Sequence, residues 1–240
     1  MVIEMNNDFG LLWEKFVDSL IYKNGYKIVL EGLTNTALIA ILGLIIGIII
    51  GTIIAIVRVM PKYKRLPRIL NKICGCYVEL FRGTPMMVQL LIAYNVLLPL
   101  LSISVDSGLP VAIIVFGLNS GAYVSEIMRG GIQSVDVGQL EAGRAVGLSY
   151  WTSMFKIVIP QAVKNILPTL GNEFIVLVKE TSITGYVATI DLTRAFTKLG
   201  SDSMSYVIPY LMLGLAYLVI VLLISWGVRA LERKLKKSEK

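Results

Sequence analysis

An uninterrupted apolar run near the N-terminus is the feature that most constrains the fold of this chain. No charged residue occurs from Gly32 to Val57, and a helix needs about 20 mostly apolar residues to cross the core of a bilayer. Of the 240 residues, 55% are hydrophobic and 16% charged, and the mean hydropathy is +0.73. A soluble fold of this length could not bury so much apolar surface. The composition therefore indicates an integral membrane protein.

Five segments have the length and hydropathy expected of membrane spans. They are residues 32–57, about 73–101, about 108–128, about 160–186 and 203–228. The fourth is the weakest by hydropathy, because Glu173, Lys179 and Glu180 interrupt its apolar runs. The sequence therefore predicts an all-α, multi-span helical membrane protein with five transmembrane helices.

Lysine and arginine residues mark the cytoplasmic side of a membrane protein. Three segments are rich in them, namely 58–72, 129–164 and 229–240. With five spans all three segments fall on one side, which predicts an N-terminus outside and a C-terminus in the cytoplasm. Orientation and anionic lipid headgroups then explain the net charge of +7 better than nucleic acid does, so no nucleic-acid partner is expected.

The predicted organisation has three parts, which are an extracytoplasmic segment (1–27), a membrane domain (28–230) and a basic cytoplasmic tail (231–240). Within the first part, residues 8–22 are expected to form an amphipathic helix on the outer membrane interface. Its apolar face consists of Phe9, Leu12, Trp13, Phe16, Leu20 and Ile21. The first residues lack a basic region followed by an apolar run, so no cleavable signal peptide is predicted.

Three glycines, Gly43, Gly47 and Gly51, recur at every fourth position of the first span. Small residues with this spacing let helix backbones approach closely in lipid. The approaching helix belongs either to the same chain or to a second subunit, and the sequence leaves both possibilities open.

The sequence lacks the residues that several classes of enzyme and metal site require. The chain has no histidine, which removes the commonest general base and the Ser-His-Asp and Cys-His nucleophile systems. Cys74 and Cys76 have neither redox nor zinc spacing, and no metal site is expected. A G-x-x-x-x-G-K-[ST] phosphate loop is also absent, so the chain cannot bind ATP by that route.

Two acid–arginine pairs lie near the cytoplasmic ends of predicted spans. Glu79 and Arg82 share one face of the second span, and Glu126 and Arg129 repeat this spacing in the third. Ionisable groups within a bilayer are costly and usually face a partner or a pathway. We expect these four residues to form one inner-gate charge network that includes an Arg82–Glu126 pair. Pro85 predicts a kink in the second span, since it lacks a backbone N–H.

Glu173 lies roughly 20 Å along the fourth span from Pro160, deep in the hydrocarbon. It either hydrogen-bonds within the subunit and shapes the fold, or faces a water-filled path. We predict a substrate path near the bilayer midplane, between the third and fourth spans. Its expected polar lining is Asn119, Ser120, Glu173 and Thr181.

The segment between the third and fourth spans, about residues 134–159, is too patterned for a simple connector. It contains Glu141-Ala142-Gly143, then Gly147 and Ser149. We expect two short cytoplasmic helices joined by a sharp turn at Gly147. The small-residue face of the first helix suits insertion into a groove on a partner protein, or packing on the chain's own spans.

This pattern resembles the EAA loop of ATP-binding-cassette (ABC) importer permeases. The family motif is Glu-Ala-Ala, three residues, Gly, nine residues and Ile-x-Leu-Pro, and here Gly143 replaces the second Ala and Ile159 replaces Leu. Within that superfamily the chain is similar to the polar amino-acid permeases over about residues 28–235. The supporting stretches are 31–36, 79–85, 122–132 and 179–182.

The resemblance implies a type I importer permease of a bacterial inner membrane that dimerises with a like or related permease subunit. Two cytoplasmic ATPase subunits, which would hold ATP and Mg, are expected below the loop. An extracytoplasmic binding protein would deliver the amino acid, and the chain itself would be no enzyme and hold no cofactor. We expect the ATPase to be contacted by Glu141, Ala142, Gly143, Gly147 and Ser149.

A secondary transporter driven by an ion gradient through Glu126 and Glu173 is the alternative. Such folds often contain inverted repeats, whereas five spans do not divide into equal halves and no internal duplication is evident. The patterned loop would also have no role there. The sequence therefore favours the ATP-driven permease.

Overall fold

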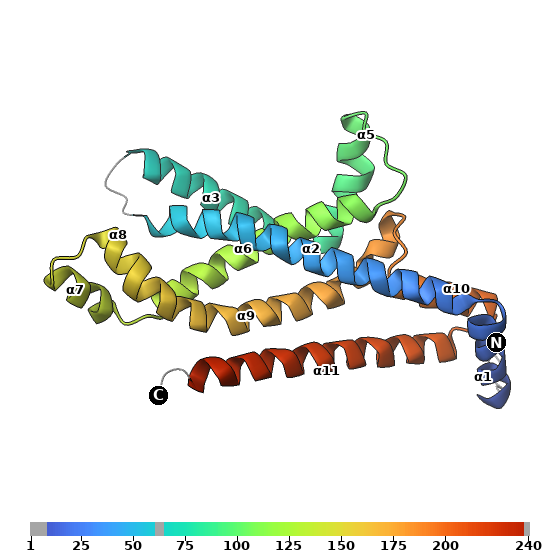
Figure 1. Cartoon of the computed structure of the whole chain (residues 1–240). Helices are drawn as coiled ribbons and strands as arrows, with labels where there is room; N and C mark the ends of the chain where they lie inside the picture. The colour runs from blue at the N-terminus through green and yellow to red at the C-terminus, as the bar shows by residue number, and fades with distance from the viewer. Residues whose placement is uncertain (1–8, 61–64, 238–240) are drawn as a thin grey trace, which may run out of the picture.

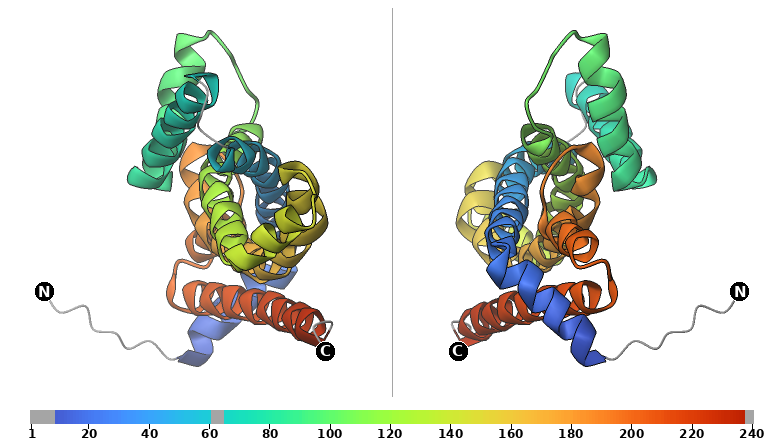
Figure 2. Two further views of the ribbon diagram at one scale, coloured as in Figure 1. Left: turned by 90° about the vertical axis from the view of Figure 1, so that its left-hand side faces the viewer. Right: turned by 90° about the vertical axis from the view of Figure 1, so that its right-hand side faces the viewer.

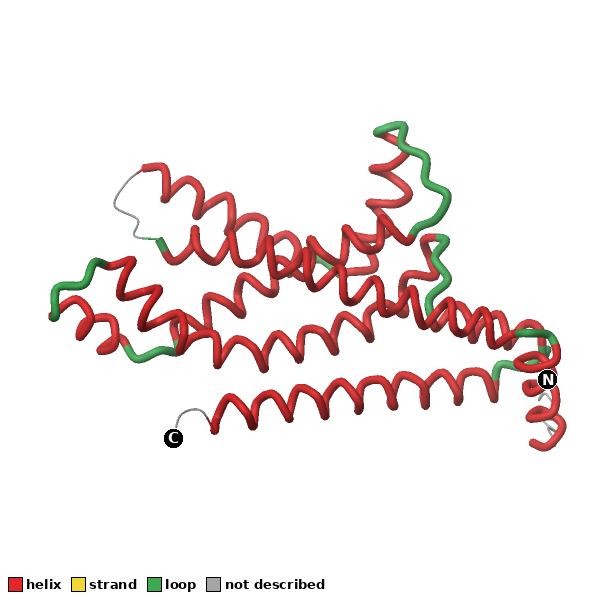
Figure 3. Tube along the Cα trace, in the orientation of Figure 1, coloured by secondary structure: helices red, strands yellow, loops and turns green. Residues whose placement is uncertain are grey.

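The structure is a computed structural model that describes residues 9–60 and 65–237. Within these ranges it is built of helices and loops, without strands, which confirms the predicted all-α class (Figure 3). The α-helices are α1 (Phe9–Val17), α2 (Gly25–Val59), α3 (Arg65–Gly83), α4 (Met86–Ile92), α5 (Leu98–Leu100), α6 (Leu109–Gln133), α7 (Val137–Ala145), α8 (Tyr150–Ser153), α9 (Ile159–Glu180), α10 (Leu192–Asp202) and α11 (Val207–Lys237). Short π-helical segments follow α1, α4 and α8, and a 3₁₀ segment, Thr181–Val187, follows α9.

Three helices, α2, α6 and α11, are long and apolar enough to cross a membrane. They correspond to the first, third and fifth predicted spans. Helix α9 carries the fourth predicted segment but does not reach the same apolar composition. The structure thus supports three spans, or four with the bent pair described next, and the count of five stays a prediction.

The second predicted span is broken rather than kinked. The helical segments 65–83 and 86–100 meet at an angle of 104°. Pro85 stands before α4 in an extended conformation, because it has no N–H to continue the helix. Two of the carbonyls freed at the break are satisfied by Gln89, whose Nε2 donates to Phe81 O at 2.8 Å and to Thr84 O at 3.0 Å. The first arm also begins at Arg65, ahead of the expected start near residue 73.

The three glycines of α2 pack against α6, so their close helix contact lies within the chain. A Cβ added at Gly47 would lie 2.6 Å from Ser120 Oγ, and one at Gly51 would lie 2.7 Å from Val124 Cβ. Gly43 meets the same helix one turn earlier. Backbones this close gain dispersion energy that no larger residue could match without moving the helices. Intrasubunit packing, one of the two open possibilities, is therefore what the structure shows.

The expected N-terminal helix over 8–22 is present over the described residues, as α1 and the π-helical turn Asp18–Tyr22. Leu12 and Phe16 are buried in a cluster with residues of α10 and α11, whereas Trp13 is half-exposed. The helix is thus fixed to the rest of the fold by its apolar face.

The long helices α2, α6, α9 and α11 run between two ends of the molecule (Figures 1 and 2). The last turns of α2, the α7–α8 segment and the C-terminal end of α11 lie at one end, and α1 and α10 lie at the other. The described residues of the three basic segments therefore share one end, as the predicted orientation requires.

Candidate functional site

A cavity of about 700 Å³ lies where the broken α3–α4 segment faces α6 and α9. The break supplies its irregular wall, from Arg82 to Met87, and α9 supplies an acidic wall. Non-helical backbone at membrane depth is tolerated where it lines a cavity or is buried in protein. The polar and charged side chains that line the cavity are Arg82, Thr84, Asn119, Tyr123, Glu173 and Glu180.

Glu173 hydrogen-bonds within the chain and also lines the cavity, and its role in a substrate path stays a prediction. Its side chain is 8% exposed and lines the cavity. Ser120 donates a hydrogen bond of 3.1 Å from its hydroxyl to Glu173 Oε1. Ser120 in turn packs against Gly47, so the absence of a side chain on α2 makes room for the hydroxyl that holds the carboxylate. The bond orients the group, and a carboxylate can accept further donors from the cavity side.

Asn119 connects α6 to the helix break. It is 6% exposed, and its Nδ2 donates to Gln89 Oε1 at 2.9 Å and to Phe81 O at 3.2 Å. Gln89 is a functional candidate that the sequence analysis missed. Its signal was a long amide side chain in an otherwise apolar helix, four residues after Pro85, where freed carbonyls need a donor.

Of the four predicted path residues, Asn119 and Glu173 line the cavity, Ser120 is fully buried behind Glu173 and reaches it only through their hydrogen bond, and Thr181 lies apart. It is fully buried and donates to Val178 O at 2.8 Å, one turn back. It is not among the residues that line the cavity. The reason is its position at the end of α9, where the chain tightens into a 3₁₀ turn and aims this hydroxyl at its own backbone.

The four predicted inner-gate charges do not form one network, and the expected Arg82–Glu126 pair is wrong. Glu126 pairs with Arg129 at 2.5 Å on its own helix and with Arg58 at the end of α2. Arg82 instead lies over the Tyr123 ring, 5.4 Å from its centroid, on the cavity side, and Glu79 is exposed. Sequence spacing places charges on helix faces, but the partner depends on which helix packs alongside.

The predicted two-helix segment is present as α7 and α8. Asp136 caps α7 by accepting from the Gly138 N–H at 2.7 Å, and Ser149 caps α8 by accepting from the Thr152 N–H. Gly147 lies between them with φ +87°, a left-handed conformation that favours glycine. The Leu148 N–H reaches back to Gly143 O at 3.1 Å, which closes the turn. The expected sharp turn at Gly147 is confirmed.

The predicted coupling residues divide between two faces of this segment. Glu141, Ala142, Gly147 and Ser149 are exposed. Gly143 is buried, and a Cβ there would lie 2.7 Å from Ser153 Oγ. Gly143 therefore holds α7 against the next helical segment and belongs to the inner face.

Comparison with known proteins decides the family. The model of the family described as "binding-protein-dependent transport system inner membrane component" matches residues 43–237. The chain belongs to this family. It is a membrane-spanning ABC importer permease, a class in which a separate subunit carries the ATPase, and nothing in the comparisons supports a secondary transporter.

Three similar proteins illustrate the match. An arginine transport system permease protein, ArtQ, of Bacillus subtilis is 41% identical over 70% of this permease and 76% of its own length. A putative glutamine permease protein, GlnP, of Rickettsia prowazekii is 35% identical over 86% and 92%. A solved amino acid ABC transporter with histidines has a TM-score of 0.81 and 36% identity, over 91% of this permease and 99% of that chain.

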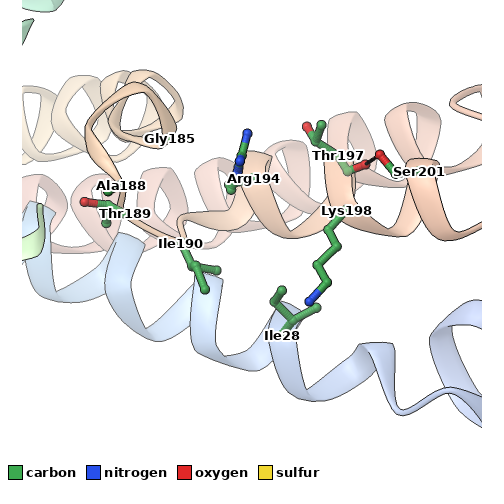
Figure 4. Close-up of a pocket in the computed structure, with 9 residues that line it drawn as sticks. All are labelled: Ile28, Gly185, Ala188, Thr189, Ile190, Arg194, Thr197, Lys198 and Ser201. Carbon is green, nitrogen blue, oxygen red and sulfur yellow. Dashed lines mark hydrogen bonds between the residues drawn. The ribbon is translucent and has the colours of Figure 1, made fainter. Parts of the chain in front are cut away.

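A different cavity, of about 410 Å³, lies beside the 3₁₀ segment Thr181–Val187, between the start of α2 and α10 (Figure 4). Arg194 and Lys198 line it, but their side chains point to different sides. Asp191 caps α10 through the Thr193 and Arg194 N–H groups, and burial raises the pKa of its carboxyl. Since the two cations do not converge, this cavity is a weaker binding candidate than the one at the helix break.

Proposed function

We propose that this permease forms the path of an ATP-driven amino-acid importer, with substrate held in the cavity at the helix break. The observation that carries the proposal is the presence of both charge signs on its walls. Arg82 lines it from α3, and Glu173 and Glu180 line it from α9. An amino acid carries an ammonium and a carboxylate, which a guanidinium and a carboxylate can bind at separate points. The printed names of the arginine and glutamine permeases support the same substrate class.

The proposed topology has five crossings of a bacterial inner membrane. The broken α3–α5 arm and α9 are the second and fourth crossings, and both border the cavity. Discontinuous spans at substrate sites are common in transporters, because freed backbone groups and helix ends can face the substrate. The shared end of the three basic segments supports a cytoplasmic C-terminus and an extracytoplasmic α1.

The proposed coupling surface is the exposed face of α7 and the turn that follows it. Val137 and Val146 are 67% and 77% exposed there, beside Glu141, Ala142 and Arg144. Apolar side chains that are this exposed on a short helical segment are suited to bind in a groove on the ATPase subunit. The chain's lack of a phosphate loop fits this division of labour, with ATP and Mg on the partner and no hydrolysis by the permease itself.

A second permease subunit and an extracytoplasmic binding protein complete the proposed assembly. Helix α11 supports the first, since only 11% of its apolar span is buried within the chain. Leu215, Leu222 and Trp226 are at least half-exposed along it. The family description, which names dependence on a binding protein, supports the second.

The experiment is uptake by the assembled transporter in proteoliposomes, with ATP inside and the binding protein outside. A panel of labelled amino acids is compared with sugars and with an ATPase variant unable to hydrolyse ATP. ATP-dependent accumulation of one or more amino acids supports the proposal. Uptake that follows an imposed ion gradient without ATP, or no amino-acid uptake by an active complex, contradicts it.

A further inference from the structure

A cavity of about 340 Å³ lies on the far side of α6 from the proposed path, enclosed by the ends of α2 and α6 and by α8 and α9. Met128 and Ile132 line it from α6, whereas Asn119 and Tyr123 of the same helix line the path. Met128 follows Asn119 by about two and a half helical turns, so the two side chains point in opposite directions. The cavity therefore opens away from the substrate path.

The lining of this cavity is apolar. Ala55 and Val59 contribute from α2, and Ala162 and Ile166 contribute from α9. The hydroxyl of Thr52, which also lines it, already donates to Ile48 O at 2.6 Å. Water needs several polar partners in a buried site, whereas an apolar cavity of about 150 Å³ is large enough to accept benzene. The chemistry of the lining therefore selects a hydrocarbon ligand.

The mouth of the cavity is continuous with a surface that faces hydrocarbon in the proposed membrane placement. Along α2 an exposed row at every third or fourth residue leads to the cavity and consists of Ile45, Ile49, Ile53 and Ile56. Ile56 is the last member of this row and also lines the cavity. Trp151 and Phe155, which are 47% and 63% exposed, border the mouth near the cytoplasmic end. Aromatic residues favour this headgroup level.

A basic side chain lies at the same membrane depth as Trp151 and Phe155. Lys156 follows Phe155 directly in the chain and is exposed. Basic side chains at the cytoplasmic surface attract anionic headgroups. We propose that the cavity binds one acyl chain of an anionic phospholipid of the inner leaflet, with its phosphate near Lys156. The inference rests on the proposed function for the membrane placement alone.

The test is photolabelling of the intact permease–ATPase complex in nanodiscs, with phosphatidylglycerol that carries a diazirine on its acyl chain. Labelled peptides are mapped by mass spectrometry. We expect labelling of residues 128–132 and 150–166 to exceed that of Ile45, Ile49 and Ile53 by about tenfold, because the cavity encloses the acyl chain and these three positions do not. Val163→Trp, at the cavity mouth, should remove this excess. Ile49→Trp, on the exposed row, should keep it.

A second filling variant, Ile132→Phe, replaces Val163→Trp should that protein fail to assemble. Lys156→Glu should lower labelling by phosphatidylglycerol relative to phosphatidylcholine by about fivefold. Uniform labelling along α2, or unchanged labelling in both filling variants, would overturn the site. An unchanged lipid preference in Lys156→Glu would overturn the anionic headgroup. Labelling needs no transport, so a complex that binds lipid here but moves no amino acid contradicts only the proposed function.

Discussion

The two faces of α6 are stabilised in different ways. On one face, α6 lies so close to three glycines of α2 that a Cβ added at Gly43, Gly47 or Gly51 would meet it at 3.1, 2.6 or 2.7 Å, respectively. On the other face, Asn119 donates to Gln89 beside a cavity, and Ser120, at the border between the faces, meets Gly47 and donates to Glu173. The first face depends on volume and the second on polar pairing. A volume change should therefore damage the α2 contact, whereas a polarity change should damage the cavity.

The largest expected effect is at the tight contact. Gly51→Leu would drive a side chain into Val124, where even a Cβ lies at 2.7 Å. We expect the free energy of unfolding to fall by about 3 kcal/mol, measured by thermal or denaturant unfolding in detergent. Gly214→Leu on α11 is the matched control, since nothing lies within 4 Å of a Cβ there. Equal stability of the two variants would show that α2 and α6 are not held by close approach.

Gly147→Val should produce the next largest effect, on coupling. No atom lies within 4 Å of a Cβ built at this residue, so a steric clash is not expected. The backbone φ of +87° instead strains a β-branched residue, at a cost of about 1–3 kcal/mol. We expect ATP-driven uptake to fall about tenfold or more, with insertion and assembly retained. Gly147→Asn should keep most activity, because asparagine tolerates this conformation. Normal uptake by the valine variant would refute the role of the turn.

Gln89→Ala tests the polar face at the helix break. It removes a donor to the carbonyls of Phe81 and Thr84 and an acceptor for Asn119. We expect a loss of about 1–2 kcal/mol of stability, read from unfolding midpoints. Asn95→Ala removes an exposed amide with a local bond to Leu91 O and should cost less than about 0.5 kcal/mol. Comparable losses would mean that Gln89 does not support the break.

The smallest expected effect is at the base of the coupling segment. Gly143→Ala should weaken the contact with Ser153 by about 1 kcal/mol. In the double variant, Ser153→Ala should restore part of the lost stability, because it removes the Ser153 hydroxyl, the atom nearest to the new Cβ. The readout is protease susceptibility of the α7–α8 segment. A double variant no better than Gly143→Ala would show that the Ser153 hydroxyl does not limit the space.

Local rules made the turn at Gly147 and a bend near Pro85 predictable, since a glycine spacing and a missing N–H act within a few residues, although the predicted kink is a full break. The 104° angle was not predictable, because it depends on how Gln89 satisfies carbonyls across the break. The Arg82–Glu126 pair failed for a related reason. Helix periodicity predicts on which face of a helix a charged side chain lies. The partner of Glu126 depends on the helix packing, which brings Arg58 next to it.

Uptake by Glu173→Gln in proteoliposomes tests most directly whether the cavity is the substrate path. The variant keeps the shape of the side chain and an acceptor for Ser120, but removes the charge. We predict a fall in amino-acid uptake of about tenfold or more, from loss of an ammonium partner. Binding-protein-stimulated ATP hydrolysis and stability should be retained. Unchanged uptake across the amino-acid panel would contradict the assignment and make Glu173 a structural residue.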